Sequence, residues 1–287
     1  MIEAAGVCDN LMRNISDRTS ELLVHSVFDN AMNFSSDCGM ITLLAPDKGL
    51  LPHAILLRDR LDFHTFANNR SFRIDRCGIL ADGQLSIDFS RARHESLRLN
   101  HPVFPESFCG ARALSYLQMF LAAYMGKGLV ELVFDRHESP YAHYLYPRFC
   151  RFRKIAQTGE DKAFIAAAYE IAGCGEGLTP SSDDLLSGYL LCASATRKKA
   201  VIKKAAYRAA AHTNDISAAL LRHGGDGLFS KDILDLIGCL ATGGSVTDVF
   251  SAFGRVAAFG SSSGCDFLTG LYFGIYDFWA GKEAMQD

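Results

Sequence analysis

The sequence predicts an α+β protein in which an N-terminal, mostly antiparallel β domain is followed by an α-helical domain. Three observations lead to this fold class. Residues 39–90 contain short β-branched and apolar runs separated by turn signals. After Pro102 and Pro105 the apolar residues recur at helical spacing, and many of the later segments are Ala-rich and end at glycine. We therefore expect a β-rich domain at 1–103 and a helical domain at 104–287.

The first expected strands lie on either side of a proline-containing turn. Residues 39–45 are β-branched and apolar, and the following Pro46-Asp47-Lys48-Gly49 has the composition of a type I turn. A second strand is expected at 53–57, directly after Pro52. A helix is expected near 8–30.

The clearest hairpin in the β domain joins residues 79–81 to 84–89. Asp82-Gly83 supplies the positive φ angles that a type I′ turn requires. Leu85, Ile87 and Phe89 then alternate onto one face of the second strand.

The helical domain is expected to begin with a helix that contains Ala113, Leu117 and Leu121 and closes at Gly126 and Gly128. Residues 129–155 have no clear periodicity. Further helices are expected at about 158–172, 180–196, 198–211, 215–223, 230–241, 245–258 and 265–280.

The charge balance excludes several classes of protein. The 287 residues include 29 Lys and Arg and 32 Asp and Glu, which gives a net charge of -3. This balance argues against binding of nucleic acid or anionic membranes by bulk charge, so any anion site must be local. With 49% hydrophobic and 21% charged residues, the composition is that of a globular protein.

Cysteine usage and hydropathy indicate a cytoplasmic protein. The nine cysteines are scattered and none forms a C-x-x-C motif, a pattern typical of reduced thiols rather than of disulfides or a zinc site. No apolar run reaches the roughly 18–20 residues of a membrane span. The first residues also lack the basic segment and apolar block of a secretory signal.

An internal repeat joins two loop–helix units. Residues 181–188 (SSDDLLSG) align with 263–270 (SGCDFLTG), so that Ser, Asp, Leu and Gly recur at the same spacing. The first copy follows the loop 173–180, and the second opens from the Ser- and Gly-rich loop 259–264. Each copy is expected to begin a helix.

A glycine-rich loop that enters a helix N-terminus can bind an anion. Backbone N–H groups there have no partner within the helix, and the helix dipole adds partial positive charge. We interpret Thr179 as the N-cap and Pro180 as the first helical residue, with the hydroxyls of Thr179, Ser181 and Ser182 as further donors. The loop lacks the G-x-x-x-x-G-K-[ST] pattern, so it is not a Walker A nucleotide site.

The acids of the two units allow three interpretations. Helix capping alone explains the local pattern, with Asp183 and Asp184 complementing the dipole. Alternatively, these carboxylates and Asp266 accept from the N–H end of a ligand whose anionic end the helix terminus holds. Binding of Mg²⁺ by Asp183 and Asp184 is the third option, since Mg²⁺ prefers oxygen ligands. In each case we expect Gly188 and Gly270 to be close helix–helix contacts below the acids.

A third polar cluster covers residues 212–217. Capping of the next helix by Asn214 or Asp215 explains most of it. His212 has the residue type of a general base, but a single histidine is more often a surface or hydrogen-bonded residue.

Together these motifs resemble the AllH family, which includes a subunit of bacterial oxamate carbamoyltransferase. Residues 177–188 (GLTPSSDDLLSG) resemble the family's G-L-T-P-S-x-D-D-x-L-x-G signature. Residues 213–217 are similar to its T-T-x-x-S element, and 260–270 to its G-H-T-S-G-x-D-x-L-x-G element. A weaker strand motif covers 49–55. Departures from the pattern occur at the positions Ser182, Ser261, Ser262 and Asn214; Ser261 stands in place of His.

The resemblance implies a subunit of a multi-subunit transcarbamoylase in anaerobic purine or allantoin breakdown. Such a complex exchanges oxalurate and phosphate for oxamate and carbamoyl phosphate. The implied partners are these small anions and the other subunits, with no membrane or nucleic acid and no required cofactor apart from the Mg²⁺ option. An alternative is a non-catalytic subunit that binds a metabolite and regulates a partner enzyme, and a purely structural scaffold would leave the two loops far apart.

The candidate site residues follow from both lines of reasoning. The catalytic candidates are Asp183, Asp184 and Asp266. The candidates for substrate binding are Gly177, Thr179, Ser181, Ser182, Thr213, Ser217, Ser262, Ser263 and Gly264. If the repeat has functional meaning, Asp184 and Asp266 must lie close together.

Overall fold

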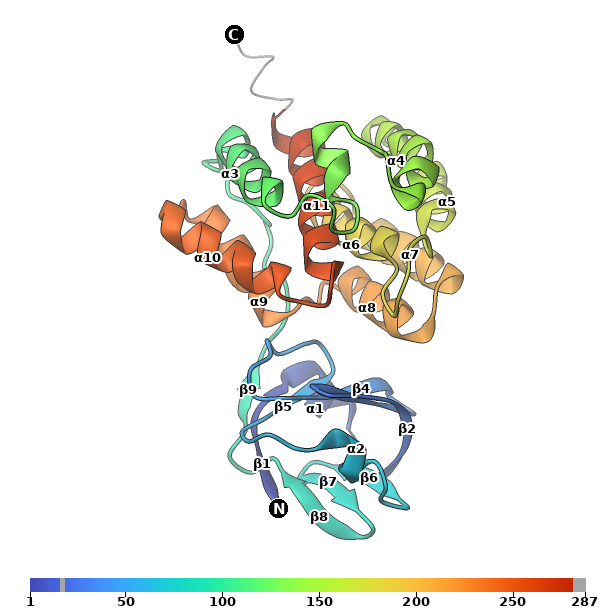
Figure 1. The fold of residues 1–287 in the computed structure, drawn as a ribbon, viewed down its shortest axis with the longest axis vertical. Coiled ribbons are helices and arrows are strands. Elements are labelled where there is room, and N and C mark those ends of the chain that lie inside the picture. The colour runs from blue at the N-terminus through green and yellow to red at the C-terminus, as the bar shows by residue number, and fades with distance from the viewer. Residues whose placement is uncertain (16–18, 281–287) are drawn as a thin grey trace. The chain divides into compact units, whose positions relative to one another are not determined.

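The computed structural model describes residues 1–15 and 19–280 and divides into two compact units. The first unit comprises Met1–Arg98 together with Phe229–Lys231. The second comprises Leu99–Leu228 and the described residues from Asp232 onward. Strands build the first unit and helices the second, so the α+β class is confirmed (Figure 1).

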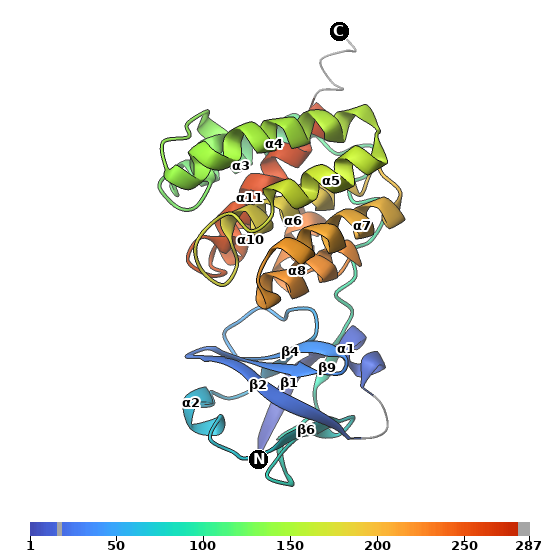
Figure 2. The same cartoon turned by 90° about the vertical axis from the view of Figure 1, so that its right-hand side faces the viewer.

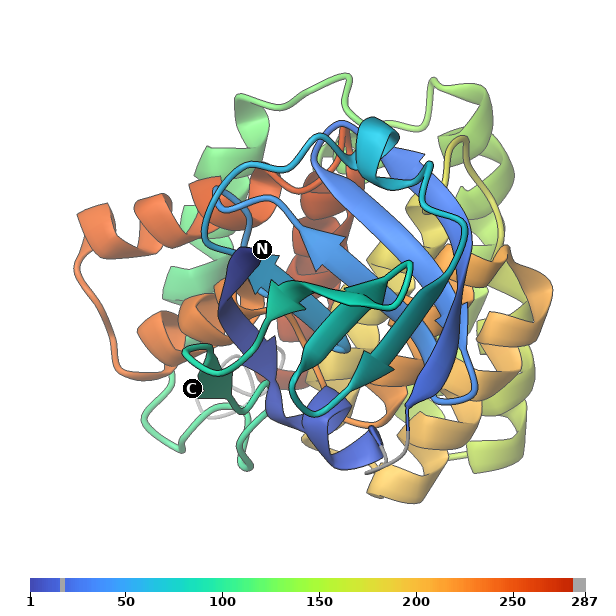
Figure 3. The same cartoon turned by 90° about the horizontal axis from the view of Figure 1, so that it is seen from below.

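The first unit is a closed β-barrel rather than a simple antiparallel sheet. Within the described residues, its ring runs β1-β5-β4-β3-β2-β6-β7-β8 and returns to β1, while β9 pairs with β1 outside the ring (Figure 3). The strands are β1 (Ile2–Cys8), β2 (Ser20–Phe28), β3 (Ala31–Ser36), β4 (Gly39–Leu44), β5 (Ala54–Leu57), β6 (Phe72–Asp75), β7 (Gly78–Ala81), β8 (Gln84–Asp88) and β9 (Arg93–Glu95). Closure satisfies the strand edges and encloses side chains such as Phe34 and Ile55.

Most neighbouring strands of the barrel are antiparallel, as expected, but three pairs are parallel. These are β4–β5, β1–β8 and β1–β9. None of these three pairs is joined by a tight hairpin, the connection that antiparallel neighbours allow. The expected hairpin is confirmed as β7–β8, where Asp82 and Gly83 have φ angles of 49° and 80°.

The expected helix near 8–30 is wrong. Only α1 (Asp9–Asn14) is helical, and β2 and β3 occupy the following region, while 16–18 lie outside the described residues. The run S-E-L-L-V-H-S-V-F of β2 contains β-branched and aromatic residues, and pairing with strands on both sides decides its conformation. A one-turn helix, α2 (Phe63–Phe66), completes the unit.

The second unit contains the helices that the periodicity predicts and one further helix in the region without clear periodicity. They are α3 (Gly110–Ala122), α4 (Pro140–Thr158), α5 (Asp161–Ile171), α6 (Ser181–Ala193), α7 (Lys199–Ala209), α8 (Asp215–Gly225), α9 (Lys231–Ala241), α10 (Val246–Ala257) and α11 (Ser263–Ile275), with short turns η1 (Val130–Phe134), η2 (Ala210–His212) and η3 (Tyr276–Ala280). The ambiguous region 129–155 forms η1 and most of α4. Figure 2 shows α4, α5 and α7 side by side on one face of the unit.

Helices α6 and α11 form the centre of the second unit. Helix α11 packs against α6 and also contacts α3 and α10 (Figure 1). A Cβ atom at Gly188 would collide with the carbonyl oxygen of Phe267, and one at Gly270 would collide with that of Leu185. The expected close contact at both glycines is therefore confirmed, and the crossing is fixed by backbone against backbone.

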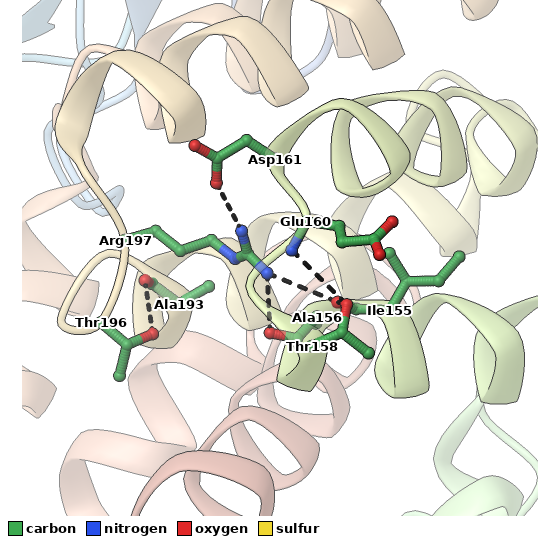
Figure 4. Close-up of polar contacts among 8 residues, drawn as sticks. All are labelled: Ile155, Ala156, Thr158, Glu160, Asp161, Ala193, Thr196 and Arg197. Carbon is green, nitrogen blue, oxygen red and sulfur yellow. Dashed lines mark hydrogen bonds and ion pairs between the residues drawn. The ribbon is translucent and has the colours of Figure 1, made fainter.

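Arg197, in the loop after α6, anchors the ends of two other helices (Figure 4). Its Nη1 donates to Oδ1 of Asp161 at 2.7 Å, and its Nη2 donates to the carbonyl oxygen of Ala156 at 2.9 Å. The side chain is 5% exposed, and its guanidinium lies 4.2 Å from the ring centre of Phe164. A buried cation at the last turn of α4 satisfies helix carbonyls and complements the dipole, so it holds α6 in place against α4 and α5.

Candidate functional site

The N-termini of α6 and α11 meet through the loops that precede them. The hydroxyl oxygens of Thr179 and Ser263 lie 2.7 Å apart and share a hydrogen bond. Thr179 is therefore not the N-cap that the local pattern suggests. Pro180 occupies that position without a side-chain cap, and α6 begins at Ser181. The hydroxyl of Thr179 instead serves a contact between the two loop–helix units, which sequence spacing alone does not reveal.

The two loop–helix repeats contact each other reciprocally. The hydroxyls of Ser263 and Thr179 lie beside Asp184 and lower its pKa, whereas those of Ser181 and Ser262 do the same for Asp266. The crossing glycines are reciprocal as well, because each meets the backbone of the other helix three residues before the partner glycine. The repeat is thus an approximate two-fold arrangement within one chain, like the isologous interface of a dimer.

The carboxylates of Asp184 and Asp266 lie close together, and within residues 1–15 and 19–280 neither forms an ion pair with a cation. Asp266 is 0% exposed, and its Oδ1 accepts from the backbone N–H of Leu129 at 2.6 Å. Burial raises the pKa of Asp266 to about 6, and burial together with the Asp266 carboxylate raises the pKa of Asp184 well above its usual range. Oδ2 of each acid is shielded from solvent and has no hydrogen-bond partner among the described residues.

Asp183 has a different environment from Asp184. Its Oδ1 accepts from the backbone N–H of Gly173 at 2.7 Å, and its Oδ2 accepts from Thr213 Oγ1 at 2.5 Å and Ser217 Oγ at 2.7 Å. Burial raises the pKa of Asp183, and these hydrogen bonds act in the opposite direction. Asp183 therefore fastens the glycine-rich loop and the N-terminus of α8 to α6.

Supporting contacts complete this network. Ser182 Oγ accepts from the backbone N–H of Cys174 at 2.8 Å, which holds the same loop. Asn214 caps α8 by accepting from Ser217 N at 3.1 Å, so the capping interpretation of this cluster is confirmed. His212 Nδ1 donates to the carbonyl oxygen of Tyr169 at 3.1 Å, and its ring stacks on that tyrosine.

A lysine near the acids was not among the sequence candidates. Lys127 stands between Gly126 and Gly128, whose φ angles are 86° and 51°. A Cβ at Gly128 would collide with the carboxylate of Asp266, so the loop packs directly on that acid. Lys127 is exposed, and its charge opposes the burial that raises the pKa of the Cys265 thiol to about 11. A basic residue between two glycines was the available signal, but periodicity assigned those glycines only to a helix end.

The remaining candidate residues differ in their surroundings. Gly177 is exposed with open space around its Cα, and Gly264 packs against the backbone of Val256. Ser262 precedes α11 as its N-cap without a side-chain cap bond. Across the described ranges, no group of three or more His, Cys, Asp or Glu side chains is arranged to hold a metal ion.

The fold and the site define a class of protein: a β-barrel unit and a helical unit in which two acid-bearing loop–helix repeats cross. Comparison with known families gives the particular assignment. Residues 3–94 match the AllH family N-terminal domain, and residues 171–275 match oxamate carbamoyltransferase subunit AllH. The two matches cover most of the chain, which therefore belongs to the AllH family. No solved structure matches it. None of the helices in the described part is long and apolar enough to span a bilayer.

Proposed function

We propose that this chain takes part in carbamoyl transfer between small anions, within an oxamate-carbamoyltransferase-like complex. The proposed reaction converts oxalurate and phosphate to oxamate and carbamoyl phosphate, or is a related carbamoyl or acyl transfer. The observation that carries the proposal is the meeting of two helix N-termini around buried acids that lack hydrogen-bond partners on Oδ2. Helix termini suit the anionic end of such substrates, and the acids suit their N–H groups.

The residues divide into three proposed roles. The hydroxyls of Thr179, Ser181, Ser262 and Ser263 hold the anionic group together with the backbone at the start of α6 and α11. Asp184 faces the reacting amide, and the enclosed Asp266 lies behind it. The positioning residues are Asp183, Ser182, Thr213 and Ser217. Gly264 lets the start of α11 pack on the backbone of α10, and the exposed Gly177 leaves room beside the first loop.

Transfer between two bound anions requires little covalent chemistry from the protein. A nucleophilic oxygen attacks the carbamoyl carbon, and negative charge develops on its oxygen. Backbone N–H groups already oriented at helix termini stabilise that charge without reorganisation. Holding both anions in contact lowers the entropic barrier further. Lys127 adds positive charge near the start of α11, where two anions in one site require it.

A regulatory role is the second candidate function. Asp266 has 0% exposure, an enclosure that favours a residue which senses a bound metabolite over one that touches it. In that case the chain binds the anion without transferring a group, and a partner enzyme responds.

Ligand-dependent thermal stability tests the binding site. Phosphate and oxamate should each raise the Tm of the purified chain, since a ligand selective for the folded state stabilises it. Ser181→Ala and Ser263→Ala should reduce that shift. Ser245→Ala is the matched control, because Ser245 caps another helix, α10, by accepting from Asp248 N at 3.2 Å. A shift that survives in both site variants would place the anion elsewhere.

Activity of the complex separates the two functions. The tagged chain is purified with its co-assembling subunits and assayed with oxalurate and phosphate. Ser181→Ala should lower the rate of transfer at saturating substrate if the chain is catalytic. If the chain is regulatory, the variant changes only the metabolite concentration that gives half of the maximal rate.

A further inference from the structure

Asp184 and Asp266 form a symmetric pair at the crossing of α6 and α11. They occupy equivalent positions in the repeat, each beside a serine of the opposite copy. Each retains an Oδ2 atom with no partner among the described residues, and Asp266 is completely enclosed. Two equivalent carboxylates with unused oxygens at one crossing point are more than helix capping requires, because a capping acid has its oxygens on backbone N–H groups or in water.

The charges around the pair leave its repulsion uncompensated. From α6, Asp183 adds a further negative charge; from α11, the Cys265 thiol adds none while protonated. The charge of Lys127, in the loop after α3, acts on Cys265 at the start of α11, and that of Arg148 in α4 acts on Cys174 in the loop before α6. Neither acid of the pair makes an ion pair within the part of the chain that the structure describes.

Two interacting carboxylates in such surroundings ionise in two separate steps. The first proton leaves while the neighbour is neutral, and the second must leave beside a negative charge in a poorly solvated site. Between the two steps the pair carries one proton and one negative charge, so it offers an acid and a base at the same time.

We propose that Asp184 and Asp266 act as a one-proton carboxylate pair that exchanges protons with the substrates of the transfer reaction. This inference rests on the proposed function. Asp184, which is partly exposed, is the member that touches the substrate, and the enclosed Asp266 is a positioning residue that acts through it.

The proton balance of the transfer fits such a pair. An oxygen of hydrogen phosphate forms a bond to the carbamoyl carbon of oxalurate and loses its proton to the pair. The bond from that carbon to the bridging nitrogen breaks, and its electrons go to the nitrogen, which takes a proton from the pair. Oxamate and carbamoyl phosphate leave, and the pair again holds one proton. In the reverse reaction the pair takes a proton from the nitrogen of oxamate and gives one to the phosphate oxygen.

Titration of the full chain tests the shared proton. With ¹³Cγ-labelled aspartate, nuclear magnetic resonance should show Asp184 and Asp266 ionising in two steps. Asp184→Asn should remove the upper step and leave a single step near the lower one. Asp266→Asn should leave one step at lower pH than the parental upper step, because the like charge has been removed.

The control for this titration is Asp248→Asn, since Asp248 lies in the first turn of α10 and is exposed. It should change neither step. If Asp266→Asn leaves the upper step unmoved, or if both parental acids are ionised at pH 7, the shared proton is refuted. Should Asp266→Asn not fold, the parental spectrum and Asp184→Asn decide the question.

Activity of the complex tests the exchange. Asp184→Asn and Asp266→Asn should each lower kcat by about 100-fold or more, with little change in KM, as expected for loss of general acid–base catalysis. The parental pH profile should be bell-shaped, and Asp184→Asn should lose the alkaline limb. A parental complex that transfers carbamoyl groups while both variants keep its kcat refutes the exchange and leaves the proposed function intact. A parental complex that neither binds phosphate nor transfers refutes both, and the titration still decides whether the pair holds one proton.

Discussion

Two buried carboxylate centres lie in the helical unit, and the protein treats them in opposite ways. Asp277 is 1% exposed at its side chain and receives two hydrogen bonds from Arg153, from Nε at 2.8 Å and from Nη2 at 2.5 Å. The hydroxyl of Tyr189 donates to the same carboxylate at 2.8 Å. The Oδ2 atoms of Asp184 and Asp266 are shielded from solvent as well, but among the described residues neither acid forms an ion pair with an arginine.

The difference separates a structural acid from a candidate functional one. A buried charge is tolerated when a cation and hydrogen bonds satisfy it, as at Asp277. At the Asp184–Asp266 pair the chain supplies only hydroxyls and one backbone N–H, so part of the hydrogen-bonding capacity stays available. By contrast, both carboxylate oxygens of Asp277 and of Asp183 accept hydrogen bonds.

The largest expected effect comes from breaking the satisfied centre. Arg153→Met leaves Asp277 buried without its cation, which should lower the free energy of unfolding by about 3–5 kcal/mol. Urea denaturation measures the change. The neighbouring pair Arg151–Glu170 is exposed, so Arg151→Met should cost no more than about 1 kcal/mol. Equal costs for the two variants would remove the contrast between buried and exposed pairs.

The next effect concerns the pH dependence of the unsatisfied centre. The pKa of Asp266 is about 6 in the folded chain, against an unfolded value of about 3.9. Because the folded pKa is the higher one, Asp266 stabilises the fold most below pH ~4 and loses this contribution as the pH rises through about 6. Asp266→Asn cannot titrate and so does not lose this contribution. The free energy of unfolding of the variant, relative to that of the parent, should therefore rise by about 2–3 kcal/mol between pH 4.5 and 7.5.

Urea denaturation of both proteins across this range measures that difference. Asp226→Asn serves as the contrast, because hydrogen bonds and Lys203 hold the pKa of Asp226 below its usual value. The stability of Asp226→Asn relative to the parent should therefore fall, not rise, as the pH increases. A constant difference between Asp266→Asn and the parent across the range would show that Asp266 titrates as an ordinary surface acid.

A smaller effect tests the crossing that brings the acids together. Gly188→Ala and Gly270→Ala should each destabilise the chain by about 1–3 kcal/mol, because the added methyl group meets backbone atoms of the other helix. Gly254→Ala in α10 meets no atom within 4 Å and should instead be neutral or stabilising by up to about 1 kcal/mol. Thermal denaturation gives both values, and a neutral result at both crossing glycines would contradict the close approach of α6 and α11.

The smallest expected effect concerns Lys127. Lys127→Met should weaken phosphate binding by about fivefold at low salt, since an exposed charge contributes up to about 1 kcal/mol. The difference should shrink at high salt, where screening removes it. Lys154→Met, an exposed lysine of α4, is the control in the same calorimetric titration. Unchanged affinity for Lys127→Met would separate this loop from the anion site.

The features predicted from the sequence are those that local chemistry determines. Asp82-Gly83 specifies its own turn, and the helix ends follow from glycines and apolar spacing. The motif at 177–188 also identified the family. The helix near 8–30 was wrong, because barrel closure outweighs the local preference of that segment. The division at residue 103, the site roles and the ligands stay predictions.

Within the site, the sequence could predict residue types but not partners. Thr213 and Ser217 were recognised as polar, yet only the packing of α8 against α6 shows that they bind Asp183. Thr179 has a side chain suited to an N-cap, but in the structure its hydroxyl shares a hydrogen bond with that of Ser263. Lys127 escaped notice because its loop reaches Asp266 through tertiary structure alone.

The wide spacing of the site along the chain has a consequence for folding. Leu129 N and Asp266 are 137 residues apart in sequence, and Thr179 and Ser263 are 84 apart. Closing such long loops costs entropy before any contact compensates for it, so contacts of this kind form late on a folding pathway. Nascent or partly folded chains therefore lack the site entirely. Under the proposed function, affinity for the small anions is therefore a property of the completed helical unit.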